Sequence, residues 1–123
     1  MSPRSQELLD AARRRLAAAA SAIDDDPSAA LSSAYYAILY AVRAALSERD
    51  IYAKTHTGAW HEFRRTFVTA GEFDDSLAAA AHAVQSARER ADYDAWAAPR
   101  EEAQRVIDLA HAFLAAIDEM LAA

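Results

Sequence analysis

Arg88 stands where the helical pattern calls for an apolar side chain. On an ideal helix it projects within about 40° of the face that carries Leu77, Ala81 and Val84. A buried guanidinium needs a carboxylate, backbone carbonyl groups or an anionic ligand as its partner. Arg88 therefore predicts either a structural ion pair or an arginine that faces an anion in a groove.

Two residues shortly after Arg88 are candidates for the same groove. Asp92 and Tyr93 lie where the helix is expected to break. Tyr93 either packs with its hydroxyl group hydrogen-bonded or lines the groove beside Arg88. A carboxylate of the same chain that closed off Arg88 would favour the structural interpretation.

The stretch KTHTGAW, residues 54–60, gathers rare residue types on one connection. It contains the only lysine, one of the four histidines and one of the two glycines of the chain. Thr55 or Thr57 is suited to cap the helix that follows, and the glycine allows close approach of the backbone. Lys54 and His56 would lie beside the free N–H groups of a helix N-terminus, where anions are favoured. A capped turn explains the threonines and the glycine, but it leaves Lys54 and His56 as candidate binding residues.

A third cluster lies on one flank of a predicted helix. Ser32, Tyr36 and Arg43 follow at spacings of four and seven residues, with Tyr40 nearby. An arginine beside tyrosines favours stacking or a hydrogen-bonded network. Both an interface between helices or protomers and a substrate site remain open for this flank.

No cofactor or metal site is expected. His56 and His61 are five residues apart across a helix start, and no carboxylate joins a histidine at ligand spacing. His82 and His111 are expected on solvent-exposed flanks of helices. The chain contains neither cysteine nor a glycine-rich phosphate loop.

About five helices must position these residues. The two glycines and three prolines stand where helices begin or end, and apolar residues recur at helical spacing between them. The pattern predicts an all-α bundle with short connections. The expected helices run from Pro3 to about residue 23, from Pro27 to about Arg49, from the loop at 50–56 to Gly71, from the cap at 74–76 to the break at 91–99, and from Pro99 to about residue 121.

Length, charge and composition describe one domain over residues 1–123. The net charge of −6 makes general nucleic-acid binding unfavourable, although a local basic patch remains compatible with it. The first ten residues are polar, and no apolar run approaches the roughly 20 residues that span a bilayer. We therefore expect a cytoplasmic location and no membrane.

Three stretches together resemble the HEPN superfamily, and within it the branch of small stand-alone proteins formerly called UPF0332. They are SSAYYAILYAVRAALSERD at 32–50, KTHTGAWHEFRRTFVTAGEF at 54–73 and ARERADYDAW at 87–96. The order of a double-tyrosine helix, a K-T-H-x-G turn and an arginine before A-D-Y is similar over roughly residues 28–115. The resemblance implies an up-and-down helical bundle that usually forms a homodimer and is paired with a minimal nucleotidyltransferase as toxin and antitoxin.

Many HEPN proteins are metal-independent ribonucleases, so the resemblance also implies ribonuclease activity. Their usual motif is an arginine followed, after four to six residues, by a histidine in a groove between protomers. The arginine stabilises the phosphate and the histidine transfers a proton. Arg88 matches the arginine, but Tyr93 occupies the histidine position and the next histidine is His111. The resemblance thus makes Arg88 and Tyr93 the candidate catalytic residues, with His56 as a candidate replacement base.

Three candidate functions follow from these residues and from the resemblance. The first is a HEPN protein of a toxin–antitoxin pair that binds RNA or a nucleotide around Arg88, with Tyr93 as a candidate acceptor for nucleotide transfer by its partner. The second is a metal-independent ribonuclease. The third is a non-catalytic helical dimerisation module. The candidate binding residues are Lys54, His56, Tyr36, Arg43 and Asp92.

Overall fold

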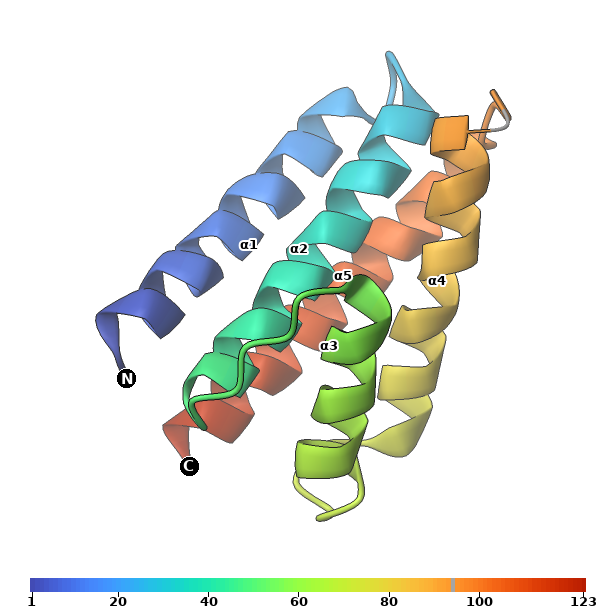
Figure 1. The fold of residues 1–123 in the computed structure, drawn as a ribbon. Coiled ribbons are helices and arrows are strands. Elements are labelled where there is room, and N and C mark those ends of the chain that lie inside the picture. The colour runs from blue at the N-terminus through green and yellow to red at the C-terminus, as the bar shows by residue number, and fades with distance from the viewer. Residues whose placement is uncertain (94) are drawn as a thin grey trace.

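The computed structural model describes residues 1–93 and 95–123 and is built of α-helices joined by short connections (Figure 1). No strand occurs in these two ranges. A π-helical turn, Arg64–Val68, continues the third helix. The predicted all-α bundle of about five helices is confirmed. The helices are α1 (Pro3–Ala22), α2 (Pro27–Ser47), α3 (His56–Phe63), α4 (Asp75–Tyr93) and α5 (Arg100–Ala122).

The four long helices α1, α2, α4 and α5 alternate in direction, so that the N- and C-terminal ends lie at the same end of the bundle (Figure 1). The central helix is α2, which packs against α1, α3, α4 and α5. After α2 ends, the chain runs back along it before the short helix α3 begins (Figure 1). This return places the first turn of α3 beside the middle of α2.

The length and apolar composition of α2 would allow it to cross a membrane, but 67% of its most apolar window is buried inside the fold. A central helix of a bundle has the same composition, because it is covered by other helices on most sides. The packing of α2 accounts for its apolar character without a bilayer.

Side-chain caps set the start of most helices, as the sequence predicts. Ser2 and Asp26 accept hydrogen bonds from backbone N–H groups in the first turns of α1 and α2. Thr55 rather than Thr57 caps α3, and its Oγ1 accepts from the N–H of Gly58 at 2.9 Å. A Cβ atom at Gly58 would lie 2.9 Å from that oxygen, so the glycine allows the cap to close. Pro99 occupies the cap position of α5 and not its first residue, a one-residue difference from the prediction.

An aromatic cluster fills the core between α3, α4 and α5. Trp60 is fully buried, and its Nε1 donates to the hydroxyl group of Tyr35 at 3.2 Å. His82 stacks on the Trp60 ring, with centroids 4.9 Å apart and planes at 13°. His82, which was expected on a solvent-exposed flank, is only partly exposed, because one side of its ring packs on Trp60. Burial, and then the charge of Arg64, lower the pKa of His82.

Glu48 connects the first turn of α1 to the end of α2. Its Oε2 accepts from the Oγ of Ser5 at 2.7 Å and from the N–H of Ser2 at 3.1 Å. These hydrogen bonds, led by the one from the backbone of Ser2, lower the pKa of Glu48. The ionised carboxylate thus stabilises the folded state.

We expect Glu48→Gln to lower the free energy of unfolding by about 1 kcal/mol at pH 7. Because the pKa of Glu48 is lower in the folded than in the unfolded chain, its contribution is complete above the unfolded value and is lost as the pH falls through the folded value. The difference from the wild type should therefore be smaller at about pH 3 than at pH 7. Urea unfolding at both pH values measures it, with the exposed Glu7→Gln as control. An equal difference at both pH values would contradict the lowered pKa of Glu48 in the folded chain.

Candidate functional site

Arg88 lies on the buried face of α4 and points toward α2, as the sequence predicts. Only 5% of the residue is exposed. Its Cζ atom lies 5.5 Å from the ring centroid of Tyr35 and 5.5 Å from that of Tyr36. The guanidinium group therefore lies over the rings of two consecutive tyrosines of α2, and the face of an aromatic ring attracts a cation.

Hydrogen bonds at the edge of the guanidinium complete this arrangement. Nη1 donates to Oδ2 of Asp92 at 2.8 Å and to the hydroxyl group of Tyr36 at 3.3 Å. Nη2 lies 3.8 Å from Oε1 of Glu89. Burial alone would lower the pKa of Arg88, but Tyr36 and Asp92 raise it above its usual value. Arg88 therefore stays charged inside the bundle.

The ion pair with Asp92 leaves part of Arg88 unsatisfied. The side chain of Asp92, one turn further along α4, is 33% exposed. Nε of Arg88 is buried and has no hydrogen-bond partner among residues 1–93 and 95–123. The structural interpretation of Arg88 gains from the Asp92 pair, because a carboxylate of the same chain does compensate its charge. An incoming anion would have to compete with Asp92, and Nε remains as a donor without a protein acceptor.

His56 contacts the same two tyrosines from α3. Its ring centroid lies 5.9 Å from that of Tyr36 and 6.1 Å from that of Tyr35. Burial, then the positive charges of Arg88 and Arg43, lower the pKa of His56 below its usual value. His56 is therefore mainly neutral at pH 7, the form that accepts a proton.

A groove opens beside this cluster along α2. It has a volume of about 200 Å³ and is lined by Tyr36, Leu39, Tyr40, Arg43 and His56. Tyr36 links this groove to the buried guanidinium, because its hydroxyl group accepts a hydrogen bond from Arg88. The structure thus brings five of the seven predicted site residues together. They are Arg88, Asp92, Tyr36, Arg43 and His56.

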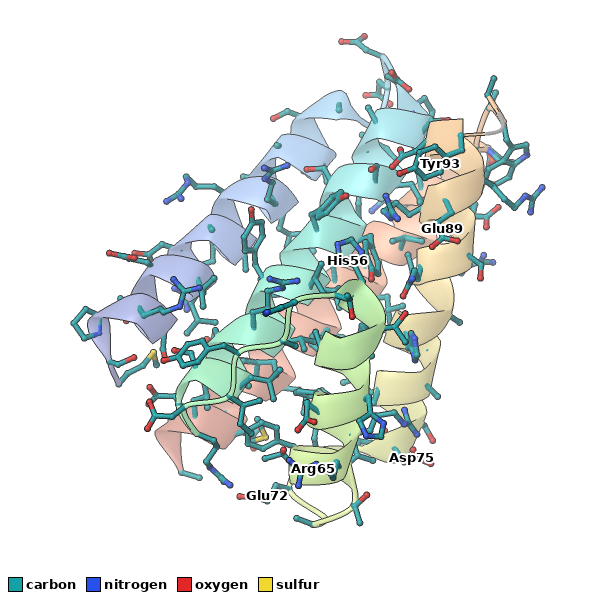
Figure 2. All side chains as sticks on the ribbon, viewed as in Figure 1. His56, Arg65, Glu72, Asp75, Glu89 and Tyr93 are labelled. Carbon is teal, nitrogen blue, oxygen red and sulfur yellow. The ribbon has the colours of Figure 1, made fainter. Side chains whose placement is uncertain are left out.

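The other two candidates lie at the margins of the cluster. Tyr93 is the last residue of α4, and 78% of it is exposed (Figure 2). Its side chain nevertheless lies close enough to Arg88 to contribute, after Tyr36 and Asp92, to the raised pKa of the guanidinium group. Lys54 is exposed in the connection before α3 and forms no ion pair with a described residue. The functional roles of all seven residues stay predictions.

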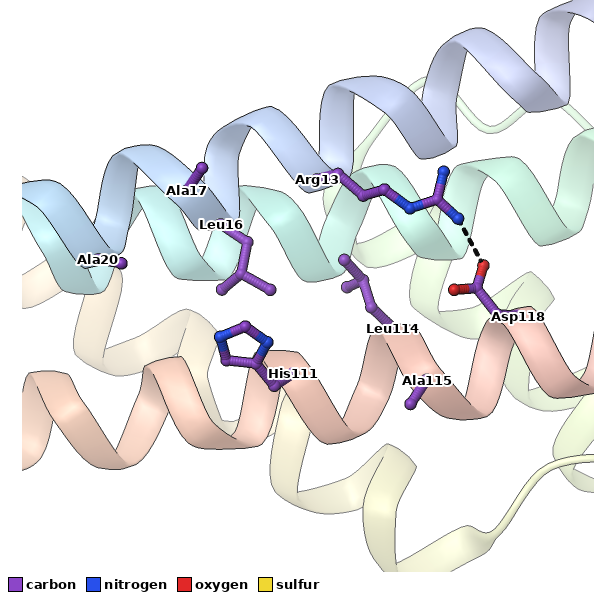
Figure 3. Close-up of a pocket in the computed structure, with 8 residues that line it drawn as sticks. All are labelled: Arg13, Leu16, Ala17, Ala20, His111, Leu114, Ala115 and Asp118. Atoms are coloured by element: carbon purple, nitrogen blue, oxygen red, sulfur yellow. Dashed lines mark hydrogen bonds and ion pairs between the residues drawn. The ribbon is translucent and has the colours of Figure 1, made fainter.

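His111, the first histidine after Arg88 in the sequence, lies elsewhere. It lines a hollow of about 380 Å³ between α1 and α5 (Figure 3). Arg13 and Asp118 form a 3.0 Å ion pair beside it. His111 therefore does not join Arg88 within the chain. Within residues 1–93 and 95–123, no group of three histidine or carboxylate side chains is placed to bind a metal ion.

The sequence did not reveal three residues that shape the site. Tyr35 was predicted only as part of the double-tyrosine helix, yet its ring contacts Arg88 and its hydroxyl group donates to Gln85 at 3.5 Å. Arg15 of α1 lies over Tyr36 and Tyr40, with Cζ 5.8 and 5.7 Å from the two centroids. The tyrosine doublet was a usable signal for Tyr35. Arg15 carried none, because its contacts depend on how α1 is rotated against α2. Glu89 directly follows Arg88, but no motif indicated its 3.8 Å approach to Nη2.

The chain is similar to known proteins at two levels, a domain family and a named relative. The model of the HEPN domain matches residues 5–120, and the chain therefore belongs to the HEPN family. The chain is also 33% identical over 81 residues to a Methanocaldococcus jannaschii protein named "Putative toxin MJ0142". The matched region covers 65% of this chain and 55% of that protein. These findings confirm the HEPN resemblance, whereas membership of the small stand-alone branch stays a prediction.

The contacts of His56 predict a specific titration behaviour. We expect its pKa to lie below 6.5 in the wild type and to rise in Arg88→Gln, because a positive charge near the ring is removed. It should remain below 6.5, since burial is the larger cause. An NMR titration of the imidazole protons measures this. Arg90→Gln, on the solvent-exposed side of α4, should leave the value unchanged, and an equal pKa in all three proteins would contradict the proximity.

Proposed function

We propose that this chain is the HEPN protein of a toxin–antitoxin pair and binds RNA or a nucleotide in the groove around Arg88. The single observation that carries the proposal is a buried, charged arginine that lies against two tyrosine rings, one of which lines an open groove. Guanidinium groups bind phosphate, and aromatic rings stack on bases. The similarity to a protein named as a putative toxin supports the toxin–antitoxin assignment. A minimal nucleotidyltransferase is the proposed partner, and the cytoplasm the proposed location.

Asp92 has a defined role in this proposal. It neutralises Arg88 in the free protein through the 2.8 Å ion pair and competes with a phosphate group for Nη1. Because one third of its side chain is exposed, Asp92 can rotate toward solvent when an anion enters. Nε of Arg88 then gains its missing acceptor. Asp92 therefore lowers the affinity for anions while stabilising the free chain.

A ribonuclease without a metal ion is the second candidate function, and the neutral state of His56 favours it. A neutral imidazole can accept the proton of a ribose 2′-hydroxyl group, while Arg88 stabilises the negative charge that develops on the attacked phosphate. Tyr93, which is exposed at the end of α4, is accessible as a proton donor or as the acceptor of a nucleotide from the partner enzyme. We propose that a homodimer brings a second copy to this groove.

The binding function is tested with a fluorescently labelled single-stranded RNA at constant salt concentration. We expect Arg88→Gln to weaken binding about tenfold or more, because a charge-assisted hydrogen bond to phosphate is lost. Asp92→Asn should strengthen binding, because the competing charge is removed while the shape of the side chain is kept. Arg90→Gln is the matched control on the exposed side of α4. Equal affinities for Arg88→Gln, Asp92→Asn and the wild type would overturn the proposal.

Cleavage is tested separately, with unlabelled RNA in the presence of EDTA. If the second function is correct, the wild type cleaves RNA, and both Arg88→Gln and His56→Ala lose at least about 100-fold in rate. Circular dichroism and sedimentation must show that the variants keep the fold and oligomeric state of the wild type. Binding without cleavage by the wild type would leave the first function and exclude the second.

A further inference from the structure

The ion pairs of the chain leave part of its positive charge uncompensated. Seven of the twelve arginines pair with a carboxylate within 4 Å, and the other five pair with none among residues 1–93 and 95–123. Arg14 and Arg90 are two of the five, and the remaining three are Arg4, Arg15 and Arg43. These three follow one another over the surface formed by α1 and α2, and the exposed Lys54 lies in the neighbouring connection. A local basic strip therefore exists on a protein with a net charge of −6. The paired arginines are Arg13, Arg49, Arg64, Arg65, Arg88, Arg100 and Arg105.

Tyrosine rings alternate with these arginines. Arg15 lies over Tyr36 and Tyr40, and Arg4 lies over Tyr52 with its Cζ 5.6 Å from the ring centroid. Tyr52 is 61% exposed, so part of its ring is accessible to a ligand. The Arg4–Tyr52 pair repeats, at the far end of α2, the combination of guanidinium and tyrosine found around Arg88.

Arg43 connects the two ends of this strip. It lines the groove beside Tyr36 and His56, and it also lines a second, smaller hollow together with Arg4, Ile51 and Tyr52. Ile51 and Tyr52 belong to the connection that runs back along α2 (Figure 1). The two hollows therefore share the side chain of Arg43 and lie next to each other, which defines a path along α2.

We infer that the Arg4–Tyr52 pair is a second binding site for single-stranded RNA, continuous with the groove around Arg88 and resting on the function proposed for that groove. Bases stack on Tyr52 or on the guanidinium planes, and Arg4 and Arg43 contact consecutive phosphate groups. The path follows one helix and alternates aromatic with cationic groups, as a single strand with accessible bases requires. A free nucleotide occupies only the Arg88 end.

Other classes of ligand fit this path less well. A duplex hides its base faces and leaves Tyr52 without a stacking partner. An acidic protein partner would satisfy the arginines but makes no use of exposed ring faces that alternate with them. Both remain outcomes of the experiment, since the affinity for an RNA duplex and for the isolated partner can be measured with the same variants.

The test compares Tyr52→Leu and Arg4→Gln with the wild type for two probes, AMP and a single-stranded RNA of about six nucleotides. We expect both variants to bind the RNA about tenfold more weakly and AMP with unchanged affinity, because one stacked base and one phosphate contact are lost. Tyr52→Phe keeps the ring and should bind RNA like the wild type. Arg13→Gln, whose arginine pairs with Asp118 between α1 and α5, is the control for lost positive charge.

The outcomes separate the second site from the proposed function. If Arg88→Gln weakens RNA binding and Tyr52→Leu does not, the second site is wrong while the proposed function stands. If Arg88→Gln has no effect on either probe, the proposed function itself fails. A loss of duplex binding equal to that of single strands, or a loss confined to binding of a nucleotidyltransferase, would also overturn the inference.

Discussion

The positive charge of Arg88 inside a helical bundle is the constraint on which the site depends. A buried guanidinium is stable only when its charge and its donors are compensated. Here the compensation comes from two ring systems of α2, one tyrosine hydroxyl group and the carboxylate of Asp92. It is incomplete, since Nε has no partner among the described residues. The same arrangement that stabilises the free chain therefore leaves a donor for an anion, and Asp92 sets how strongly an anion must bind to displace it.

The position of α2 explains how one helix can serve both the core and the site. Its buried residues contact four other helices, while Tyr36, Tyr40 and Arg43 line the groove on its remaining side. The connection after α2 runs back along this helix, and the Thr55 cap fixes where α3 begins. His56, the first residue of α3, is thereby placed against the tyrosine doublet. A local capping interaction and the path of one connection thus determine the chemistry available near Arg88.

Much of the fold could be predicted because it depends on local signals. Caps, prolines and apolar periodicity gave the helices, and the helical position of Arg88 gave its burial. The contacts between helices were less accessible. The pairing of Trp60 with His82 and the approach of Arg15 to α2 depend on the rotation of whole helices, which no short pattern encodes. The HEPN resemblance placed His56 and Arg88 in one site, but the exposure of Tyr93 follows only from where α4 ends.

The proposed function rests on the claim that Arg88 exchanges Asp92 for a phosphate group. Its most direct test is the NMR signal of the Arg88 Nε–H group in protein labelled with ¹⁵N at arginine, recorded during a titration with single-stranded RNA. We predict that this signal shifts on binding, as Nε acquires an acceptor, and that the signal of Arg90 does not. An Arg88 signal that stays unchanged at saturating RNA would show that the guanidinium remains with Asp92 and would contradict the claim.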